Sequence, residues 1–275
     1  MKGTIVRQIS NLYTVDVDGN LYQCRARGKF YHDKLTPLVG DKVIIDPNNN
    51  YILEILTRRN FLKRPSIANI DVCAIITSTK KPNLDLNLLD RLLTLVIHNK
   101  IRPVICFTKI DLLTKEEKQN LQKIIKYYQS LEIKVFTNQK LKKFTKDLKK
   151  QTVVLTGQTG AGKSTLLNKL NKNLLLETKP ISKALGRGVH TTRHVELFKY
   201  KTSLIADTPG FSSLDLSKLT PQEIKNTFSE FNENCEYHDC MHLLEPNCEV
   251  KSLVKKGKIL ESRYLNYKKF IEVRK

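Results

Sequence analysis

The sequence has no run of apolar residues near the ~20 that a membrane-spanning helix requires. Its first segment, Met1–Ser10, lacks the apolar stretch found in secretory signal peptides. We therefore expect a cytoplasmic protein. The chain has 275 residues, of which 40% are hydrophobic, and it shows no internal repeat. This length and composition fit one large domain with smaller ones attached.

Acidic residues are scarce in this chain. It has 27 Asp and Glu against 48 Lys and Arg, which gives a formal charge of +21. Residues 63–215 hold 28 basic and 12 acidic residues, so most of the excess lies there. Such a charge attracts polyanions, either nucleic acid or an acidic membrane surface. The alternative is that lysine serves as a general surface residue.

The six cysteines do not have the spacing of a disulfide framework. Cys24, Cys73 and Cys106 lie singly in apolar, strand-like runs, where buried free thiols are common. The other three lie within 14 residues, between Cys235 and Cys248. This clustering indicates a metal site rather than disulfides.

The first 62 residues have the pattern of a small β-barrel. Five short runs are rich in β-branched and aromatic residues, and Asp18-Gly19-Asn20 predicts a hairpin turn between two of them. The predicted strands are Thr4–Ile9, Tyr13–Val17, Leu21–Arg25, Lys42–Ile45 and Tyr51–Leu56. Five strands in this length favour a barrel of the OB type, and another small β-barrel is the alternative.

The rest of the chain divides in two. In residues 63–215, strand-like and helix-like runs alternate, which predicts a mostly parallel sheet with helices on both faces. In residues 216–275, Thr220 and Glu223 have the spacing of a helix capping box, a Cys/His-rich loop follows, and the tail from Ser252 is helical in pattern. We therefore expect three domains: an OB-type barrel, an α/β P-loop domain and an α-helical metal-binding domain.

A glycine-rich loop carries the strongest functional signal. It follows an apolar strand and opens a predicted helix, as a P-loop does. Its glycines let backbone N–H groups face phosphates, Lys163 can reach the β- and γ-phosphates, and the Ser164 hydroxyl can bind Mg²⁺. The predicted nucleotide-binding residues here are Gly157, Gln158, Thr159, Gly160, Ala161, Gly162, Lys163, Ser164 and Thr165.

Two switch segments are expected after this loop. Asp207 ends an apolar strand and can hold Mg²⁺ through water, while the Gly210 N–H can sense the γ-phosphate. A segment with hydroxyl groups precedes that strand, and there Thr192 is the first choice for a second Mg²⁺ ligand, with Thr191 as the alternative. A Ras-like enzyme has Gln after the switch glycine, whereas this chain has Phe211. His190 is a candidate to orient the attacking water, or else it faces solvent or a partner.

The residues that would read guanine precede the phosphate loop. They are Thr108, Lys109, Ile110 and Asp111, at the end of a predicted strand. The Asp111 carboxylate can accept hydrogen bonds from guanine N1–H and the exocyclic amine, which adenine cannot offer. Lys109 would pack its stem over the base, and Thr137-Asn138 is the expected loop behind it. This order of motifs is a circular permutation of the Ras-like order.

The cluster Cys235-x4-Cys240-x-His242-x5-Cys248 offers three thiolates and one imidazole. Soft sulfur and nitrogen ligands in a set of four favour a structural zinc site. His238 competes with His242, and the spacing alone does not choose between them.

Together these motifs resemble those of the RsgA (YjeQ) family of circularly permuted GTPases. The resemblance covers essentially the whole chain, including Arg64-Pro65, Ala68–Asp71, Gly186–His194 and Asp207–Phe211. It implies a GTPase in late maturation of the 30S ribosomal subunit, stimulated by that subunit and binding 16S rRNA through the OB and zinc modules. It also implies GTP and GDP, Mg²⁺, and one Zn²⁺ on Cys235, Cys240, His242 and Cys248. We expect a monomer with no membrane partner.

Other functions remain open at this stage. An RNA-binding adaptor that uses GTP only as a structural ligand would show no stimulated turnover. A permuted GTPase could also serve the large subunit or a tRNA pathway. An ATPase is the weakest reading, because Asp111 would then have no task.

Overall fold

The computed structural model describes residues 1–28, 30, 35–63, 66–170, 195–207, 215–231 and 235–272. The chain forms two compact units. The first comprises Met1–Val72, Thr145–Thr156 and Gly162–Ser212, and the second comprises Cys73–Phe144, Gly157–Ala161 and Ser213–Lys275. The three domain ranges expected above therefore stay predictions. Within the described residues, no helix has the length and apolar character needed to cross a bilayer.

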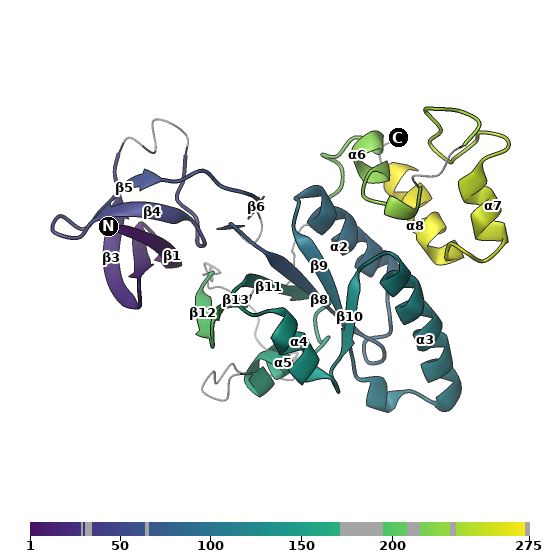
Figure 1. Ribbon diagram of the computed structural model, residues 1–275, viewed down its shortest axis with the longest axis horizontal. Coiled ribbons are helices and arrows are strands. Elements are labelled where there is room, and N and C mark those ends of the chain that lie inside the picture. The colour runs from purple at the N-terminus through teal and green to yellow at the C-terminus, as the bar shows by residue number, and fades with distance from the viewer. Residues whose placement is uncertain are drawn as a thin grey trace, which may run out of the picture. The chain divides into compact units, whose positions relative to one another are not determined.

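The N-terminal strands close into a barrel in the order β1-β2-β3-β5-β4, with β1 also paired to β4 (Figure 1, purple). Only β3 and β5 pair in parallel. The strands are β1 Lys2–Ile9, β2 Leu12–Val17, β3 Asn20–Ala26, β4 Lys42–Asp46 and β5 Tyr51–Ile55. Ile5, Val15 and Ile52 are fully buried on the inward face, as alternation predicts. The predicted OB-type barrel is confirmed.

The turn between β2 and β3 is set by two left-handed residues. Asp18 has φ 51° and Gly19 has φ 94°, the conformation that a tight hairpin requires at both central positions. The Gly19 N–H donates to the Asp16 carboxylate at 2.7 Å. The predicted hairpin turn is therefore present.

A buried ion pair fixes the chain after the barrel. Asp41 is fully buried, and the Arg58 guanidinium donates to both of its carboxylate oxygens at 2.7 Å. Gly40, beside Asp41, has φ 90°, and a Cβ there would lie 2.1 Å from the Ala68 carbonyl oxygen. Ala68 ends the short hairpin β6 (Phe61–Lys63) and β7 (Ser66–Ala68). This close approach makes glycine necessary at position 40.

A second sheet has six strands in the order β10-β9-β8-β11-β13-β12. They are β8 Val72–Ser78, β9 Arg102–Thr108, β10 Lys134–Thr137, β11 Thr152–Gly157, β12 Leu197–Tyr200 and β13 Ser203–Asp207. β10 pairs with β9 in parallel, and so does β11 with β13, as predicted. The edge strand β12 runs antiparallel to β13 because only Lys201 and Thr202 separate them, which permits a hairpin but no crossover.

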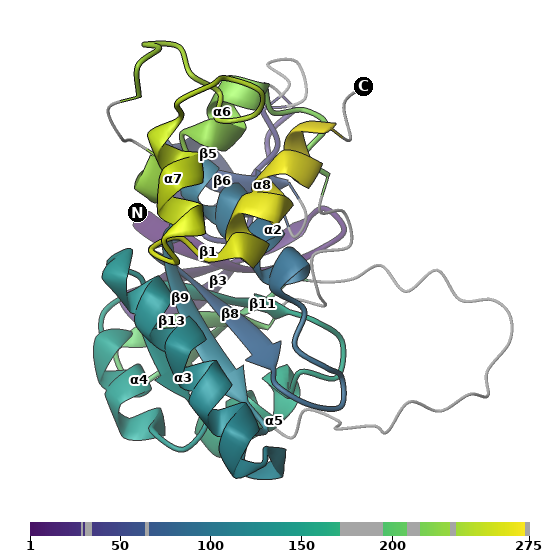
Figure 2. The same ribbon diagram turned by 90° about the vertical axis from the view of Figure 1, so that its right-hand side faces the viewer.

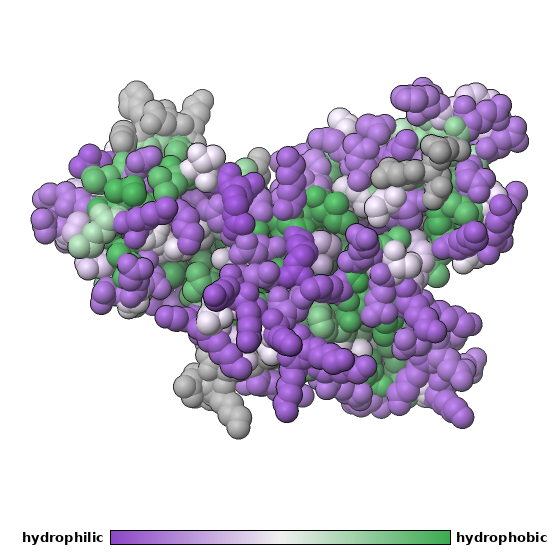
Figure 3. Space-filling view, viewed as in Figure 1, coloured by the Kyte–Doolittle hydropathy of each residue, from purple (hydrophilic) through white to green (hydrophobic). Residues whose placement is uncertain are grey.

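Helices follow the strands of this sheet along the chain. They are α2 Leu86–His98, α3 Lys115–Ser130, α4 Leu141–Asp147 and α5 Lys163–Leu170. α3 begins with a capping box between Thr114 and Glu117. On α4, Phe144 is buried, and the lysines of residues 140–150 are exposed on the hydrophilic surface seen in Figure 3. This agrees with a solvated helix face.

The C-terminal residues build a small helical core. Its elements are α6 Pro221–Lys225, η2 Ser229–Phe231, α7 Glu249–Lys255 and α8 Glu261–Glu272. The predicted capping box of Thr220 and Glu223 begins α6. Phe228, Phe231 and Tyr267 pack together, with ring centroids of Phe231 and Tyr267 4.8 Å apart. The predicted helical tail consists of two helices, interrupted near Gly257, whose φ is 69°.

A buried polar network joins α8 to α2, which lie side by side in Figure 2. Arg263 is 1% exposed and Asp90 is fully buried, and their N and O atoms are 2.8 Å apart. Arg263 also pairs with Glu230 at 2.8 Å. The other Asp90 contacts are donors, the Tyr128 hydroxyl and the Asn266 amide, each at 2.7 Å. Paired and hydrogen-bonded charges of this kind are costly to separate.

We predict that Asp90→Ala lowers the free energy of unfolding by about 3–5 kcal/mol, because it leaves the Arg263 charge buried with one partner fewer. Equilibrium urea unfolding, followed by far-UV circular dichroism, measures the change. Glu116→Ala is the control, since it removes a carboxylate from an exposed position of α3. It should alter stability by no more than about 0.5 kcal/mol. A loss below about 1 kcal/mol for Asp90→Ala would contradict the role given to the network.

Candidate nucleotide site and metal centre

The glycine-rich loop joins the end of β11 to the start of α5, as predicted. Gly157, Gly160 and Gly162 have φ values of 134°, 77° and 93°. A Cβ at Gly157 would lie 1.9 Å from the Ile76 carbonyl oxygen, so only glycine fits there. Inside the loop, the Ala161 N–H donates to the Gln158 carbonyl at 3.1 Å. These features give the tight backbone curl that a phosphate cradle requires.

The remaining predicted residues of the loop stand at its accessible side and in the first turn of α5. Thr159, Gly160 and Thr165 are exposed, while Lys163 and Ser164 are half-buried. Lys163 and Ser164 are the first two residues of α5. The N–H groups at a helix start carry partial positive charge, which favours an anion there.

The residues predicted to read guanine meet the phosphate loop. The buried Thr108 hydroxyl donates to the Ala161 carbonyl at 2.6 Å. The Lys109 ammonium donates to the Gly160 carbonyl at 2.8 Å and also to the Lys81 carbonyl. Lys109 has φ 58°, a left-handed conformation that is uncommon for lysine. Two segments some fifty residues apart in the chain are thereby held together.

Asp111 lies just after this contact, within the single 3-10 turn Ile110–Leu112. Its side chain is exposed. A carboxylate accepts hydrogen bonds and donates none, so Asp111 can bind N–H groups of a base.

The predicted loop behind the base lies beside this turn. Thr137 ends β10 in register with Phe107 of β9, and the Asn138 N–H donates to the Phe107 carbonyl at 2.9 Å. The Asn138 side-chain oxygen is buried and has no hydrogen-bond partner among the described residues. A buried amide without a partner costs about 1–3 kcal/mol, so it fits a place completed by a ligand.

The structure describes only one of the expected switch residues, Asp207. Asp207 ends β13, and its backbone lies in parallel register with Leu155 of β11, two residues before Gly157. His190, Thr191, Thr192 and Gly210 lie outside the described residues. Their roles remain predictions.

Three cysteines and one histidine converge in the C-terminal part. The His242 Nδ1 atom lies 3.6 Å from the Cys235 sulfur and 3.4 Å from the sulfurs of Cys240 and Cys248. All four ligand atoms lie within 4.8 Å of one another. Tetrahedral Zn²⁺ with bonds of ~2.0–2.3 Å requires spacings of this size. His238 is exposed and outside this cluster, so the geometry favours His242.

Side chains of α6 and α8 hold the backbone of the loop Cys235–Cys248, here called the metal loop. The Tyr264 and Tyr267 hydroxyls donate to the His242 and Met241 carbonyls at 2.7 Å and 2.6 Å. The Lys225 ammonium donates to the Cys240 carbonyl at 2.8 Å. The loop is therefore positioned by the helices as well as by its ligand set.

Two of the four ligands have a pKa shifted toward the form that binds metal, whereas burial raises the pKa of Cys240 and Cys248. Burial lowers the pKa of His242, with Lys225 adding to the effect, which keeps its imidazole neutral. Burial alone would raise the pKa of Cys235, but the N–H groups of Glu249 and Val250 at the start of α7 outweigh it, so the pKa is lowered. A neutral imidazole and a thiolate are the forms that bind zinc.

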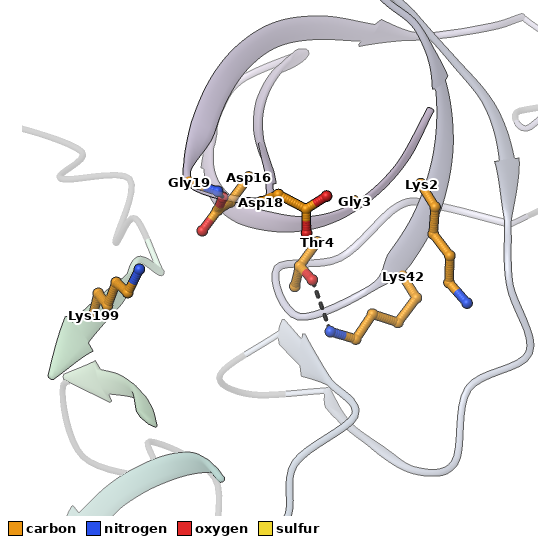
Figure 4. A pocket seen from close by; sticks show the side chains of 8 residues that line it. All are labelled: Lys2, Gly3, Thr4, Asp16, Asp18, Gly19, Lys42 and Lys199. Carbon is orange, nitrogen blue, oxygen red and sulfur yellow. Dashed lines mark hydrogen bonds between the residues drawn. The ribbon is translucent and has the colours of Figure 1, made fainter. Parts of the chain in front are cut away.

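A separate hollow of 670 Å³ lies in the first unit, against the barrel (Figure 4). Its charged side chains are Lys2, Lys42 and Lys199 against Asp16 and Asp18. Lys42 donates to the Thr4 hydroxyl at 2.7 Å. Because positive and negative groups nearly balance, this hollow does not have the charge of a polyanion site.

Two sets of contacts at these sites were not predicted from the sequence. Lys109 was expected over the base, yet its ammonium also ties Gly160 to Lys81. Pro82, next to Lys81, lies 3.5 Å from the position of a Cβ on Gly160. The contacts of Tyr264 and Tyr267 with the metal loop were not anticipated either. No sequence motif marks these contacts, because the partners are backbone carbonyls.

The fold and the site define a P-loop GTPase in which the residues predicted to read the base precede the phosphate loop. The profile of the RsgA GTPase matches residues 55–217, and that of the RsgA N-terminal domain matches residues 2–52. The chain belongs to the RsgA GTPase family. Membership implies GTP, GDP and Mg²⁺, and the glycine conformations and the unpartnered side-chain oxygen of Asn138 fit a nucleotide.

Similar proteins and solved structures match this chain over nearly its full length. The small ribosomal subunit biogenesis GTPase RsgA of Enterococcus faecalis is 44% identical, covering 98% of this chain and 94% of its own. That of Halalkalibacterium halodurans is 42% identical, covering 98% and 96%. Crystal structures of YloQ, a circularly permuted GTPase, and of Thermotoga maritima YjeQ match with TM-scores of 0.83 and 0.85. Their identities are 34% and 31%, covering 100% and 99% of this chain and 96% and 98% of theirs.

We predict that the purified protein contains about one zinc per chain and that His242→Ala loses most of it on dialysis, because a ligand is removed from the set of four. His238→Ala is the matched control, since this neighbouring histidine lies outside the cluster. Atomic emission spectroscopy measures the metal, and the melting temperature should fall with it. Equal zinc in both variants would contradict the ligand set.

Proposed function

We propose that this chain is a GTP-hydrolysing assembly factor that acts on the 30S ribosomal subunit late in its maturation. It binds 16S rRNA through the barrel and the C-terminal module as a monomer. The relatives that are named small ribosomal subunit biogenesis GTPases, and match over nearly the whole chain, support this role. The charge of +21 supports a polyanionic partner.

One observation carries the nucleotide part of the proposal. The hydrogen bonds from Thr108 and Lys109 to the carbonyls of Ala161 and Gly160 join the base-reading turn to the phosphate loop. A nucleotide spanning these two segments would place its base near Asp111 and its phosphates over Gly160. The permuted order of motifs in the chain thus yields one composite binding site.

The predicted residues take the following roles in this proposal. Asp111 accepts from guanine N1–H and the exocyclic amine, and Thr137-Asn138 lies behind the base. Backbone N–H groups of the loop bind the phosphates together with Lys163. Ser164 holds Mg²⁺ with Thr192 or Thr191, and Asp207 holds it through water.

Hydrolysis is proposed to be slow without a partner. The position after Gly210 is Phe211, which cannot orient water as Gln does in Ras-like enzymes. His190 is our candidate for that task. When a partner completes the site, stimulation by orders of magnitude is common among GTPases.

GTP turnover measured with 30S subunits, 50S subunits or neither tests the function. We predict a rise of more than about tenfold with 30S subunits alone. Lys163→Ala is the control, because it removes the cation expected on the phosphates and should abolish turnover in every mixture. Turnover that no subunit changes would instead favour a GTP-dependent RNA adaptor. Stimulation by 50S subunits alone would favour a large-subunit factor.

Asp111→Asn tests the reading of the base. An amide can donate to the carbonyl that xanthine has in place of the guanine amine, whereas toward guanine it keeps one acceptor oxygen and turns an N–H donor toward the exocyclic amine. We predict that affinity for GTP falls about a hundredfold and that XTP becomes the better ligand. Competition against a fluorescent nucleotide measures both affinities. Wild-type protein that binds ATP and GTP equally would refute the assignment of Asp111.

A further inference from the structure

The metal loop, Cys235–Cys248, has a charge opposite to that of the protein, and it is called the acidic loop from here on. It contains Glu236, Asp239 and Glu245 and has no lysine or arginine, in a chain of formal charge +21. Three thiolates around one Zn²⁺ would add a further negative charge. Phosphate backbones repel such a surface, since nucleic-acid affinity comes chiefly from lysine and arginine.

Two large apolar side chains stand out from this loop. Leu244 is 93% exposed, and Tyr237 is 43% exposed. Glu236, His238 and Asp239 beside Tyr237 are exposed as well. The acidic loop therefore combines accessible carboxylates with accessible apolar groups.

The backbone that carries Leu244 is held in place. The Glu245 carboxylate accepts from the N–H groups of Met241 and Leu243, each at 2.7 Å. The Lys251 ammonium donates to the Glu245 carbonyl at 2.8 Å, so this nearby cation is directed at the loop backbone. An apolar side chain on a fixed turn loses little conformational entropy on binding, which favours its use as an anchor.

The helices beside the acidic loop have the opposite charge. Residues 249–272 hold seven Lys and Arg against three Glu, and the six lysines are exposed or half-buried while Arg263 is buried. The C-terminal part is therefore polarised, with a basic helical side and an acidic loop. Contacts with rRNA phosphates suit the helices, and the acidic loop suits a different kind of surface.

We propose that the acidic loop docks on a basic protein surface of the small subunit, with Leu244 and Tyr237 entering an apolar socket bordered by lysine or arginine. The proposal rests on the function proposed above, because it names the partner of one part of the chain. Charge complementarity and the apolar anchors favour protein over RNA as the occupant. Protein interfaces typically place apolar anchors inside a polar rim.

The effect of a charge reversal on binding distinguishes a basic protein from RNA as the partner of the acidic loop. Asp239→Lys should weaken binding to purified 30S subunits about tenfold if the acidic loop faces a basic protein. Unchanged or tighter binding would overturn the proposal, because added lysine strengthens an RNA contact. Glu116→Lys, a reversal on exposed α3, is the matched control. Zinc content equal to wild type shows that the variant keeps its fold.

The anchor itself is tested with a second pair of variants. Leu244→Ser should weaken binding to 30S subunits and leave binding to protein-free 16S rRNA unchanged. Leu244→Met keeps an apolar side chain at the same position, so it is the matched control and should change neither. An equal loss on 30S subunits and on protein-free rRNA would overturn the proposal, as would no loss on either.

A photo-crosslink identifies what touches the acidic loop. Leu244→p-benzoylphenylalanine in full-length protein, irradiated on purified 30S subunits, should give adducts with a ribosomal protein. Adducts with 16S rRNA alone, or none, would overturn the proposal. Failure of the wild-type protein to bind 30S subunits would instead refute the proposed function, so the two failures are distinguishable.

Discussion

The contact of Thr108 and Lys109 with the phosphate loop is the constraint on which the candidate site depends. Thr108 and Lys109 donate to the backbone carbonyls of Ala161 and Gly160. Both segments follow strands of one sheet, and the carboxyl ends of parallel strands gather binding loops. A permuted chain can therefore form the same composite site, because the site needs neighbouring strand ends rather than a particular order of motifs.

The C-terminal helices are joined to α2 by a buried ion pair. Asp90 of α2 and Arg263 of α8 are buried together, and Asn266 and Tyr128 complete the hydrogen bonds of the carboxylate. Separating buried, satisfied charges is costly, so α8 stays with α2. The metal loop in turn is held to α8 by Tyr264 and Tyr267. Hydrogen bonds and a buried ion pair thus connect α2 to the acidic loop through α8.

Much of the fold follows from local patterns. The five barrel strands, the Asp18-Gly19 turn and the capping box of Thr220 depend on alternation, backbone freedom and nearby hydrogen bonds, and all are found where predicted. The antiparallel direction of β12 and the break at Gly257 were not predicted. Periodicity reports which residues are buried but not the direction in which a strand pairs.

The sequence by itself determined the chemistry that is available: a phosphate loop, a carboxylate after Lys109, and three thiolates with an imidazole. Each of these sets is encoded by residues close together in the chain. Only the tertiary structure decided that Lys109 donates to the Gly160 carbonyl and that Asp90 pairs with Arg263. The choice of His242 over His238, which the spacing left open and the family resemblance implied, agrees with the cluster in the structure. Those contacts join distant residues through backbone carbonyls and buried charges, and neither leaves a spacing that can be read along the chain.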